Sequence, residues 1–551
     1  MTRVSLSAIH AVIVAVASMA NGWAQTPATN VKSRSELVSV PVVVIDSSGG
    51  HVRDLKKEDF TVLEDGEEQT IAVFEEIDRA SASTTNDQHP AGEFNNVSLG
   101  NRSPQLTIIL LDFLNTPVSD QIHAKDELVK YLADSSGSAP PTSVLALTKS
   151  GVKIIHHFTR DSKELMKAVN GVQRSQPPVT EDPSEALLTT ATDKLSTVLQ
   201  SFGEFQVGSE QTLISFDRRR VITLTLDGMR QIAQAYAGFP GRKTLIWASG
   251  GFPFVINEAN MALREGVAPI DTQANIQPLY EKTWEALNQA QISMYPVDVH
   301  GLGELPGPAT APVKKPLPDP FMHGQWLHAE TNATFELFAK ATAGRAYMNQ
   351  NGLERAIRSA NDDSSSYYVL GYYLHREGKK DGWRKLHVDV HRKGIQVLAR
   401  TGFFLRGSTG SQDDASPDSM QAALDSPLEY TAIPITARWQ ETVDAEQGKK
   451  KAIFTLTMPA GFAEVDEDDR NRFALDFWAC ARTPAGKAAG DIQQTMQGHF
   501  KPEAFDRFRT NGTDYRGAIT VAPGEYVVRF VVRDRLSGRI GTVSAPLKVD
   551  R

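Results

Sequence analysis

The sequence has almost no cysteine: Cys480 is the single one among 551 residues. One thiol cannot form a disulfide within the chain, so the stability of the folded protein must come from packed apolar cores. Cys480 lies in the alternating apolar segment FALDFWACAR, a pattern that predicts a small buried strand residue and not a nucleophile. The cysteine content therefore excludes a disulfide-stabilised fold and gives no support to thiol catalysis.

Basic runs are also missing. Nowhere do five or more Lys and Arg residues stand together, and the formal net charge is −8. A protein that binds nucleic acid or an anionic membrane surface normally shows a concentrated basic patch. We therefore expect no nucleic-acid partner, while protein, glycan and small-molecule partners stay open.

Long apolar runs are scarce, and the one that stands out covers residues 8–20, after Arg3. It is shorter than the ~20 apolar residues that span a bilayer. The small residues Gly22 and Ala24 that follow it are typical of a signal-peptide cleavage site. We predict a signal peptide at residues 1–24 and an exported chain, periplasmic or secreted, with no membrane span after cleavage. An uncleaved anchor is the alternative.

Common catalytic motifs are missing as well. We find no HExxH zinc motif, no paired CxxC, no P-loop, no Rossmann fingerprint and no Gly-x-Ser-x-Gly nucleophile elbow. His156 and His157 are neighbours on a predicted strand, so they point to opposite faces and cannot easily share one metal ion. Asp362 and Asp363 are interpreted as solvated charges at a helix end. The sequence predicts no catalytic residue, and we expect a protein that is not an enzyme.

What the chain does contain is a succession of strand-rich and mixed segments, and its length predicts three or four domains of roughly 100–200 residues each. The dipeptide Asp65-Gly66, between two alternating apolar runs, predicts a hairpin turn. Strand-like segments late in the chain lead us to suggest that they pair with the early ones. The predicted order is an N-terminal β segment at 33–78 that pairs with 365–405, a linker at 78–104, an α/β domain at 105–345, a connecting helix and strands at 346–405, a linker at 406–424 and a β-sandwich at 425–551.

Residues 105–345 alternate between apolar strands and amphipathic helices, which is typical of a mainly parallel sheet with helices on both faces. The fold class predicted for the chain is therefore α/β, with a doubly wound mainly parallel sheet flanked by antiparallel β domains. The predicted elements are a strand at 107–112, helices near 119–133, 158–169, 184–201, 225–236 and 277–290, a hairpin at 143–158, and strands at 244–249 and 292–302.

Several phrases of the sequence are similar to one known family. They are FTVLEDGEEQTIAVF, LLDFLNT, GRKTLIWASGGFP, ISMYPVDVHGL and SSSYYVLGYYL, followed by ARTGFF. Together they resemble the bacterial VWFA-related exported proteins, and the order of elements from 105 to about 345 resembles the von Willebrand factor type A fold. The resemblance covers most of residues 37–405. It implies adhesion or protein binding at the carboxyl ends of the strands, through a metal-ion-dependent adhesion site.

The first motif of such a site is Asp-x-Ser-x-Ser, which reads Asp112-Phe113-Leu114-Asn115-Thr116 in this chain. The resemblance implies Asp112 and Thr116 as ligands of Mg²⁺, or of Mn²⁺ or Ca²⁺, since these hard cations prefer oxygen donors. Leu114 departs from the pattern, because it places an apolar side chain where an oxygen is expected. The alternative for Asp112 is that it closes the turn by accepting backbone N–H groups.

The other elements of the family's site match less well. A threonine that precedes a helix corresponds to Thr223, with Thr225 as a neighbouring candidate. The family's third element is an aspartate at a strand end, and this chain has Gly250 there, after Ser249. Asp298, at the end of the next strand, is the remaining candidate ligand. The resemblance thus implies a degenerate metal site with fewer oxygen donors than the family pattern.

We predict an exported protein-binding or adhesion module that contacts a protein partner at a rim formed by Asn115, Ser249 and Gly250. Open α/β sheets bind ligands at the carboxyl ends of their strands, which favours this rim. Two alternatives stay open: an exported hydrolase or sugar-processing protein whose site is not visible in the sequence, and a structural envelope component.

Overall fold

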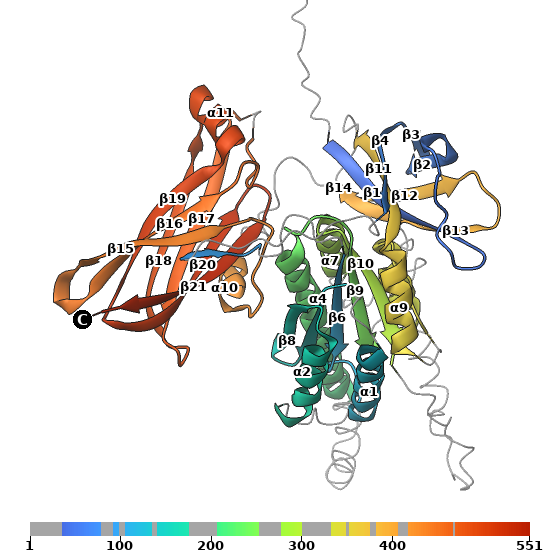
Figure 1. Ribbon diagram of the computed structural model, residues 1–551, viewed down its shortest axis with the longest axis horizontal. Helices are drawn as coiled ribbons and strands as arrows, with labels where there is room; N and C mark the ends of the chain where they lie inside the picture. The colour runs from blue at the N-terminus through green and yellow to red at the C-terminus, as the bar shows by residue number, and fades with distance from the viewer. Residues whose placement is uncertain are drawn as a thin grey trace, which may run out of the picture.

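The computed structural model describes residues 36–78, 92–97, 105–134, 140–175, 207–252, 277–299, 332–348, 352–374, 382–405, 417–466 and 469–550. Their strands form five sheets, in an N-terminal β part, a central α/β part and a C-terminal sandwich (Figure 1).

The predicted fold class is wrong for the chain. Four of the five described sheets are antiparallel throughout, and the fifth is mixed. The described structure is therefore mostly antiparallel β structure with one helix-covered mixed sheet, and not a doubly wound parallel fold. The prediction gave too much weight to the one region where strands alternate with helices.

The mixed sheet has the strand order β10-β9-β6-β7-β8. Strands β10, β9, β6 and β7 are parallel, and β8 runs antiparallel to β7. All residues of β6, β7 and β9 are buried, because both faces of the sheet are covered, and this explains their continuous apolar sequences. The strands are β6 (Leu106–Asp112), β7 (Thr142–Thr148), β8 (Gly151–Thr159), β9 (Lys243–Ser249) and β10 (Ile292–Asp298).

Helices pack on both faces of this sheet. On one face, α1, α2 and α9 share an apolar core with Ile109 and Leu111. On the other face, α4, α7 and the helical residues 332–341 share a core with Ile108 and Leu110. Alternate residues of β6 thus pack into the cores on opposite faces of the sheet. The helices are α1 (Val118–Asp134), α2 (Ser162–Ser175), α4 (Val207–Tyr236), α7 (Gln277–Gln289) and α9 (Leu353–Asp363).

The N-terminal β part consists of two four-stranded sheets with an apolar core between them. Its hairpin at Asp65-Gly66 is confirmed, since β2 pairs with β3 and the two turn residues have φ angles of 51° and 90°. One sheet has the order β13-β1-β11-β4, with β13 (Ile395–Leu398), β1 (Glu36–Asp46), β11 (Ser366–Leu374) and β4 (Ile71–Asp78). The other has the order β14-β12-β2-β3, with β14 (Gly402–Leu405), β12 (Gly382–Val390), β2 (Phe60–Glu64) and β3 (Glu67–Gln69).

The C-terminal sandwich also has two four-stranded sheets around a separate apolar core. Its first sheet has the order β19-β16-β15-β5, with β19 (Thr513–Val521), β16 (Lys450–Met458), β15 (Thr436–Asp444) and β5 (Glu93–Asn95). Its second sheet has the order β18-β17-β20-β21, with β18 (Ala488–His499), β17 (Arg472–Arg482), β20 (Gly524–Asp534) and β21 (Ile540–Val549). Helix α11 (Pro502–Asn511) lies between β18 and β19 in the chain.

Strand β5 corrects the prediction that residues 78–104 are only a linker. It pairs with β15, at the edge of a sandwich sheet whose other strands come from the far end of the chain. The next residue, Asn96, fixes it: its side-chain amide donates to the carbonyls of Tyr430 (2.7 Å) and Ile433 (2.8 Å) and accepts the N–H of Ile435 (2.8 Å). A buried amide that makes three bonds holds this strand in place.

The sandwich is attached to the α/β part at the C-terminal end of α4. The backbone N–H of Thr431 donates to the carbonyl of Gln234 (3.1 Å), and its hydroxyl donates to the carbonyl of Ala235 (2.7 Å). The same hydroxyl accepts the N–H of Gly238 (2.9 Å). These bonds satisfy backbone groups that a helix end leaves without an intrahelical partner. The two parts also share one apolar core, so we call this contact the joint.

Two predicted boundaries change. Helix α10 (Pro417–Asp425) begins inside the predicted linker 406–424, and Arg529 of β20 donates to the carbonyl of its residue Ala423 (3.0 Å). Helix α4 begins at Val207, well before the predicted helix at 225–236. Charged residues at 217–220 interrupt the helical spacing of apolar residues, so the sequence pattern did not predict the first half of this helix.

Two predictions lie outside the described residues: the signal peptide at 1–24 and the helix at 184–201. Among the helices that the structure does describe, none is long and apolar enough to cross a bilayer.

Tyr236, the last residue of α4, gives the α/β part a testable pH dependence. It is buried beside Phe158 and Phe239, and this burial raises the pKa of its hydroxyl from 10.0 to about 12. Stability from neutral Tyr236 is present below the unfolded pKa and is lost as the pH rises through the folded pKa. We expect the Tm to fall between about pH 9 and about pH 12, and to fall less in Tyr236→Phe, as measured by differential scanning calorimetry. An equal fall in both proteins would contradict this assignment.

Candidate functional site at the carboxyl ends of the mixed sheet

The carboxyl ends of β6, β9 and β10 meet at one edge of the mixed sheet, which we call the rim. Ser249, at the end of β9, lies opposite Asp298 in the register with β10. Leu111, directly before Asp112, lies opposite Ala248, directly before Ser249. The strand ends and the loops after them therefore bring several predicted site residues together. The rim contains Asp112, Asn115, Thr116, Ser249, Gly250 and Asp298.

Asp112 is the centre of the rim and is 1% exposed. Its Oδ1 accepts the backbone N–H groups of Leu114 (3.2 Å) and Asn115 (3.0 Å). Its Oδ2 accepts the side-chain amide of Asn115 (2.8 Å), the indole N–H of Trp247 (2.9 Å) and the hydroxyl of Ser249 (2.9 Å). The carboxylate thus closes its own turn and ties the end of β6 to β9.

A second set of bonds joins the same two loops. The backbone N–H of Gly250 donates to the hydroxyl oxygen of Thr116 (2.8 Å), and Gln121 of α1 donates to the carbonyl of Thr116 (2.8 Å). A Cβ at Gly250 would lie 3.0 Å from Cδ of Pro117 and 3.1 Å from Cγ2 of Thr116. The absence of a side chain at 250 therefore allows the close approach of the loops.

Thr225, and not Thr223, reaches the rim from α4. The hydroxyl of Thr225 accepts the side-chain amide of Asn115 (2.9 Å) and donates to the carbonyl of Val221 (2.9 Å). The hydroxyl of Thr223 donates to the carbonyl of Arg219 (2.9 Å), one turn earlier in its own helix. The sequence analysis gave Thr225 only as the neighbour of Thr223. The sequence alone does not show which side of a long helix faces its packing partners, so it could not tell which of the two threonines points to the rim.

Burial raises the pKa of Asp112 above its ordinary value, and the hydrogen bonds from Asn115, Trp247 and Ser249 act in the opposite direction. A fully buried carboxyl group is costly unless hydrogen-bond donors surround it. The five bonds to Asp112 supply that compensation, so the side chain is a structural link between the loops.

The rim does not fit a divalent cation. Both oxygens of Asp112 already accept hydrogen bonds, and Leu114 and Gly250 offer no side-chain oxygen at the two positions where the expected pattern has one. Mg²⁺ requires near-octahedral oxygen coordination. Within the described ranges, no group of three or more His, Cys, Asp or Glu side chains could hold a metal ion. The donor set therefore supports the turn-closing role of Asp112.

We expect millimolar Mg²⁺ or Mn²⁺ to leave the Tm of the full chain unchanged to within about 1 °C, because a ligand stabilises a fold only if it binds the folded state. Differential scanning fluorimetry with and without EDTA measures this directly. A reproducible upward shift that disappears in Asp112→Asn would show that the rim does hold a cation.

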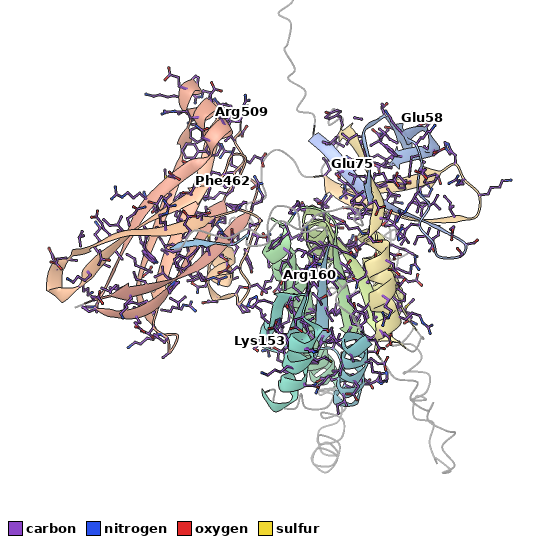
Figure 2. The ribbon with its side chains drawn as sticks, in the orientation of Figure 1. Glu58, Glu75, Lys153, Arg160, Phe462 and Arg509 are labelled. Atoms are coloured by element: carbon purple, nitrogen blue, oxygen red, sulfur yellow. The ribbon has the colours of Figure 1, made fainter. Side chains whose placement is uncertain are left out.

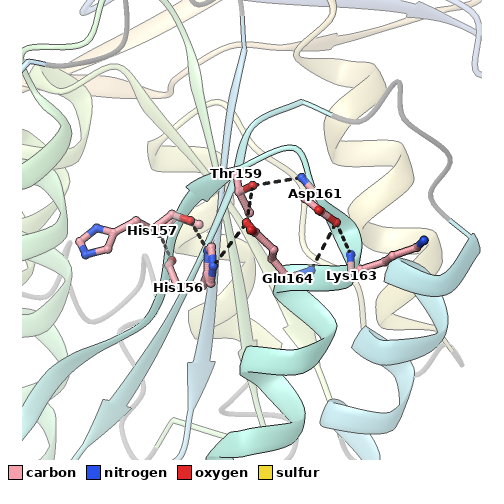
Figure 3. A network of polar contacts seen from close by, with 7 residues as sticks. His156, His157, Thr159, Asp161, Lys163 and Glu164 are labelled. Carbon is pink, nitrogen blue, oxygen red and sulfur yellow. Dashed lines mark hydrogen bonds and ion pairs between the residues drawn. The ribbon is translucent and has the colours of Figure 1, made fainter. Parts of the chain in front are cut away.

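His156 and His157 lie on β8, and their side chains point to opposite sides (Figure 3). Nδ1 of His156 lies 2.7 Å from the carbonyl oxygen of His157, and its Nε2 lies 3.9 Å from the carboxylate of Glu164. Asp161 caps α2, since its Oδ1 accepts the N–H groups of Lys163 (2.8 Å) and Glu164 (3.3 Å). This network ends a strand and begins a helix.

Asp363 corrects the interpretation of Asp362 and Asp363 as solvated charges. Asp362 is exposed, whereas Asp363, the last residue of α9, is 4% exposed. Its Oδ1 lies 3.6 Å from the guanidinium of Arg345, and the buried Arg242 donates to the hydroxyl of Tyr295 (2.8 Å) nearby. Burial raises the pKa of Asp363, while Arg345 and Arg242 lower it. Local sequence gave no sign of this cluster, because its members are far apart in the chain.

Comparison with known proteins finds similarity only among solved structures. No protein-family model matches the chain, and no curated protein does. Among solved structures, a glycosyl hydrolase family 2 member from Bacteroides cellulosilyticus is similar over 33% of this chain and 20% of its own, with 7% identity and a TM-score of 0.15. A β-glucuronidase from Bacteroides uniformis is similar over 33% of this chain and 19% of its own, with 7% identity and a TM-score of 0.16.

These findings overturn the predicted family. No protein-family model and no curated protein matches the chain, so the resemblance to VWFA-related proteins and the adhesion function that it implied are wrong. The chain spans about a fifth of the length of the matched solved structures. At such TM-scores the likeness assigns neither a family nor a function to the chain.

Proposed function

We propose that this chain is a binding protein that contacts a protein partner at the rim without the help of a metal ion. The observation that carries the proposal is the tie between the loops after β6 and β9, made by Asp112 and Thr116. Loops that are fixed before binding lose little conformational entropy when a partner arrives. The carboxyl ends of parallel strands are also the usual place for ligands on an open sheet.

One residue gives this surface its exposed contact. Pro117, directly after the Thr116 contact, is exposed. Its ring fixes the backbone φ angle, so it offers a partner a rigid apolar surface. Oδ1 of Asn115 accepts no hydrogen bond from any residue that the structure describes, but this atom is buried and takes no part in the proposed contact.

The test is capture of partners from an envelope extract by the immobilised full chain. We expect the captured set to be the same with and without EDTA, to be lost in Pro117→Arg, and to be kept in Arg160→Glu. Arg160 is an exposed control directly after Thr159, which pairs with Thr142 at the amino end of β7. Capture that is indifferent to Pro117→Arg would overturn the proposal, and loss with EDTA would overturn its metal-free form.

A second candidate function is sugar processing, and Asp363 is the observation that favours it. A buried acid whose pKa is raised, beside two arginines and a tyrosine, is an environment that also occurs at sites of acid–base chemistry. The test is release of the chromophore from a panel of nitrophenyl glycosides and glucuronides. Turnover that Asp363→Asn abolishes would support this candidate, and the absence of turnover by the full chain would reject it.

A further inference from the structure

Strand β18 is the longest strand at the edge of any sheet that the structure describes. It covers the 12 residues Ala488–His499 and pairs with β17 on one side. On its other side, no strand of the described sheets is paired with it. An edge strand presents backbone N–H and C=O groups to which a further strand can bond.

The sequence of β18 lacks the residues that usually protect an edge strand. It reads AAGDIQQTMQGH, which contains no lysine, arginine or proline, and Asp491 is its one carboxylate. Other edge strands of the described sheets do carry charges, such as Glu75 on β4 and Lys153 on β8 (Figure 2). Charged residues and proline at an edge prevent unwanted pairing, so their absence indicates that this edge is used for pairing.

The middle of β18 extends beyond the apolar core of the sandwich. Residues 493–497 are all exposed, although alternate residues of a strand point to opposite sides of its sheet. Ile492 packs against the core, whereas Met496, four residues further on and on the same side, is 39% exposed. The central part of this edge is therefore open to another strand.

The sequence of β18 is suited to pairing with a second copy of itself. In an antiparallel pair centred on Gln494, that residue lies opposite the same residue of the second copy. Ile492 then lies opposite Met496, so the two large apolar residues of the strand meet across the pair. Asp491 lies opposite Gln497, so no like charges face each other. Twofold symmetry makes each of these pairs twice.

The same pairing closes the assembly at two copies. Over residues 490–498, an antiparallel pair makes about eight to ten backbone hydrogen bonds. It joins two four-stranded sheets into one continuous sheet that ends in β21 on both sides. Strand β21 contains Pro546 and Lys548, which are the kinds of residue that oppose further strand pairing. A dimer, and not a fibre, is the expected product.

We propose that the chain forms a dimer with a second copy of itself by antiparallel pairing of β18, centred on Gln494. Backbone hydrogen bonds along the edge hold the two copies together, and the contacts between Ile492 and Met496 set the register. This surface is distinct from the rim, so the proposal does not depend on the function proposed above.

The test is sedimentation of the full chain at concentrations from about 1 to about 100 μM, where we expect a concentration-dependent dimer. Gln494→Lys and Gln494→Glu each place two like charges directly opposite each other in the dimer. Each variant should therefore weaken the dimer at least about tenfold. An equal mixture of the two variants should restore it, since a lysine then faces a glutamate. This restoration requires that both variants are folded.

A third variant tests the direction and register of the strands. Gln497→Lys places a lysine opposite Asp491 of the second copy, at both of the symmetric positions. We expect it to strengthen the dimer about two- to tenfold, because opposite charges on adjacent strands stabilise pairing. A dimer that is weakened or left unchanged by Gln497→Lys would contradict the antiparallel register.

Gln440→Lys is the matched control for the variants of Gln494. Gln494 accepts the hydroxyl of Tyr515 (2.8 Å), and Gln440 is also an exposed glutamine of the sandwich that bonds to a side chain, Thr455 (3.3 Å). It lies on β15, an inner strand, so its variant should dimerise like the unmodified chain. A chain that stays monomeric at about 100 μM, or a dimer that both Gln494 variants leave unchanged, would overturn the proposal. A mixture of the two variants that stays monomeric would overturn it as well.

Discussion

Gly238→Ala is expected to break the joint between the sandwich and the α/β part. A Cβ at this position would lie 2.0 Å from the carbonyl oxygen of Thr431 and 2.9 Å from its carbonyl carbon. Backbone atoms cannot turn aside as a flexible side chain does, so the end of α4 and the segment around Thr431 must separate. The hydrogen bonds from Gly238 to Thr431 and from Thr431 to Ala235 would be lost with it.

We expect Gly238→Ala to cost about 3 kcal/mol or more and to lower the Tm by roughly 6–10 °C. Calorimetry should show an early transition, and hydrogen exchange should show lost protection at the end of α4 and around Thr431. Gly171→Ala is the matched control: no atom lies within 4 Å of its Cβ, and it lies in α2, where alanine is favoured by up to about 1 kcal/mol. A Gly238→Ala protein that melts like the unmodified chain would show that the joint is not packed in this way.

Asp112→Ala should have the second large effect. The change leaves the indole of Trp247, the amide of Asn115 and the backbone N–H of Leu114 without the acceptor that they now share. Buried donors that lose their acceptor cost about 1–3 kcal/mol each, and partial relaxation reduces the sum. We expect a loss of roughly 3–5 kcal/mol and a fall in Tm of about 8–12 °C, measured by calorimetry without added metal.

Threonine variants on α4 provide the matched comparison for this site. Thr225→Val removes the acceptor of the Asn115 amide and should cost about 1 kcal/mol. Thr223→Val removes a hydroxyl that bonds only to its own helix backbone among the described contacts, and should change stability by less than about 0.5 kcal/mol. Equal effects of the two variants would contradict the orientation of α4 at the rim.

Most strands and helices could be predicted from the sequence, because the burial of one or both faces determines the spacing of the apolar residues within each element. Strand β6 is an unbroken apolar run since both of its faces are covered, and the turn at Asp65-Gly66 is marked by residues that tolerate positive φ. That Asp112 and Ser249 lie near each other follows from parallel strands whose carboxyl ends share an edge. These inferences need only the pattern within each element.

What could not be predicted depends on contacts between distant segments. Strand β5 has only the residues Glu93–Asn95, and so short a segment is too brief to show a period; only its pairing with β15 makes it a strand. The local sequence predicts that Asp363 is a charge on the surface, whereas it is buried by Arg345 and the sheet beside it. The choice of fold class failed for a related reason, since local alternation does not show how many strands the rest of the chain contributes.

The place of β5 in the sandwich also affects how the protein is made. Asn96 emerges from the ribosome long before Ile435, which follows it by 339 residues and holds it in the finished sheet. At about 5–20 residues per second, synthesis of the intervening chain takes on the order of 20–70 s. All strands of the mixed sheet lie between Asn96 and Ile435 in the chain, so this sheet can form before β5 has its partner strand. The sandwich can close only after β21 has been synthesised, and until then its unpaired strand edges are sites where another chain can pair.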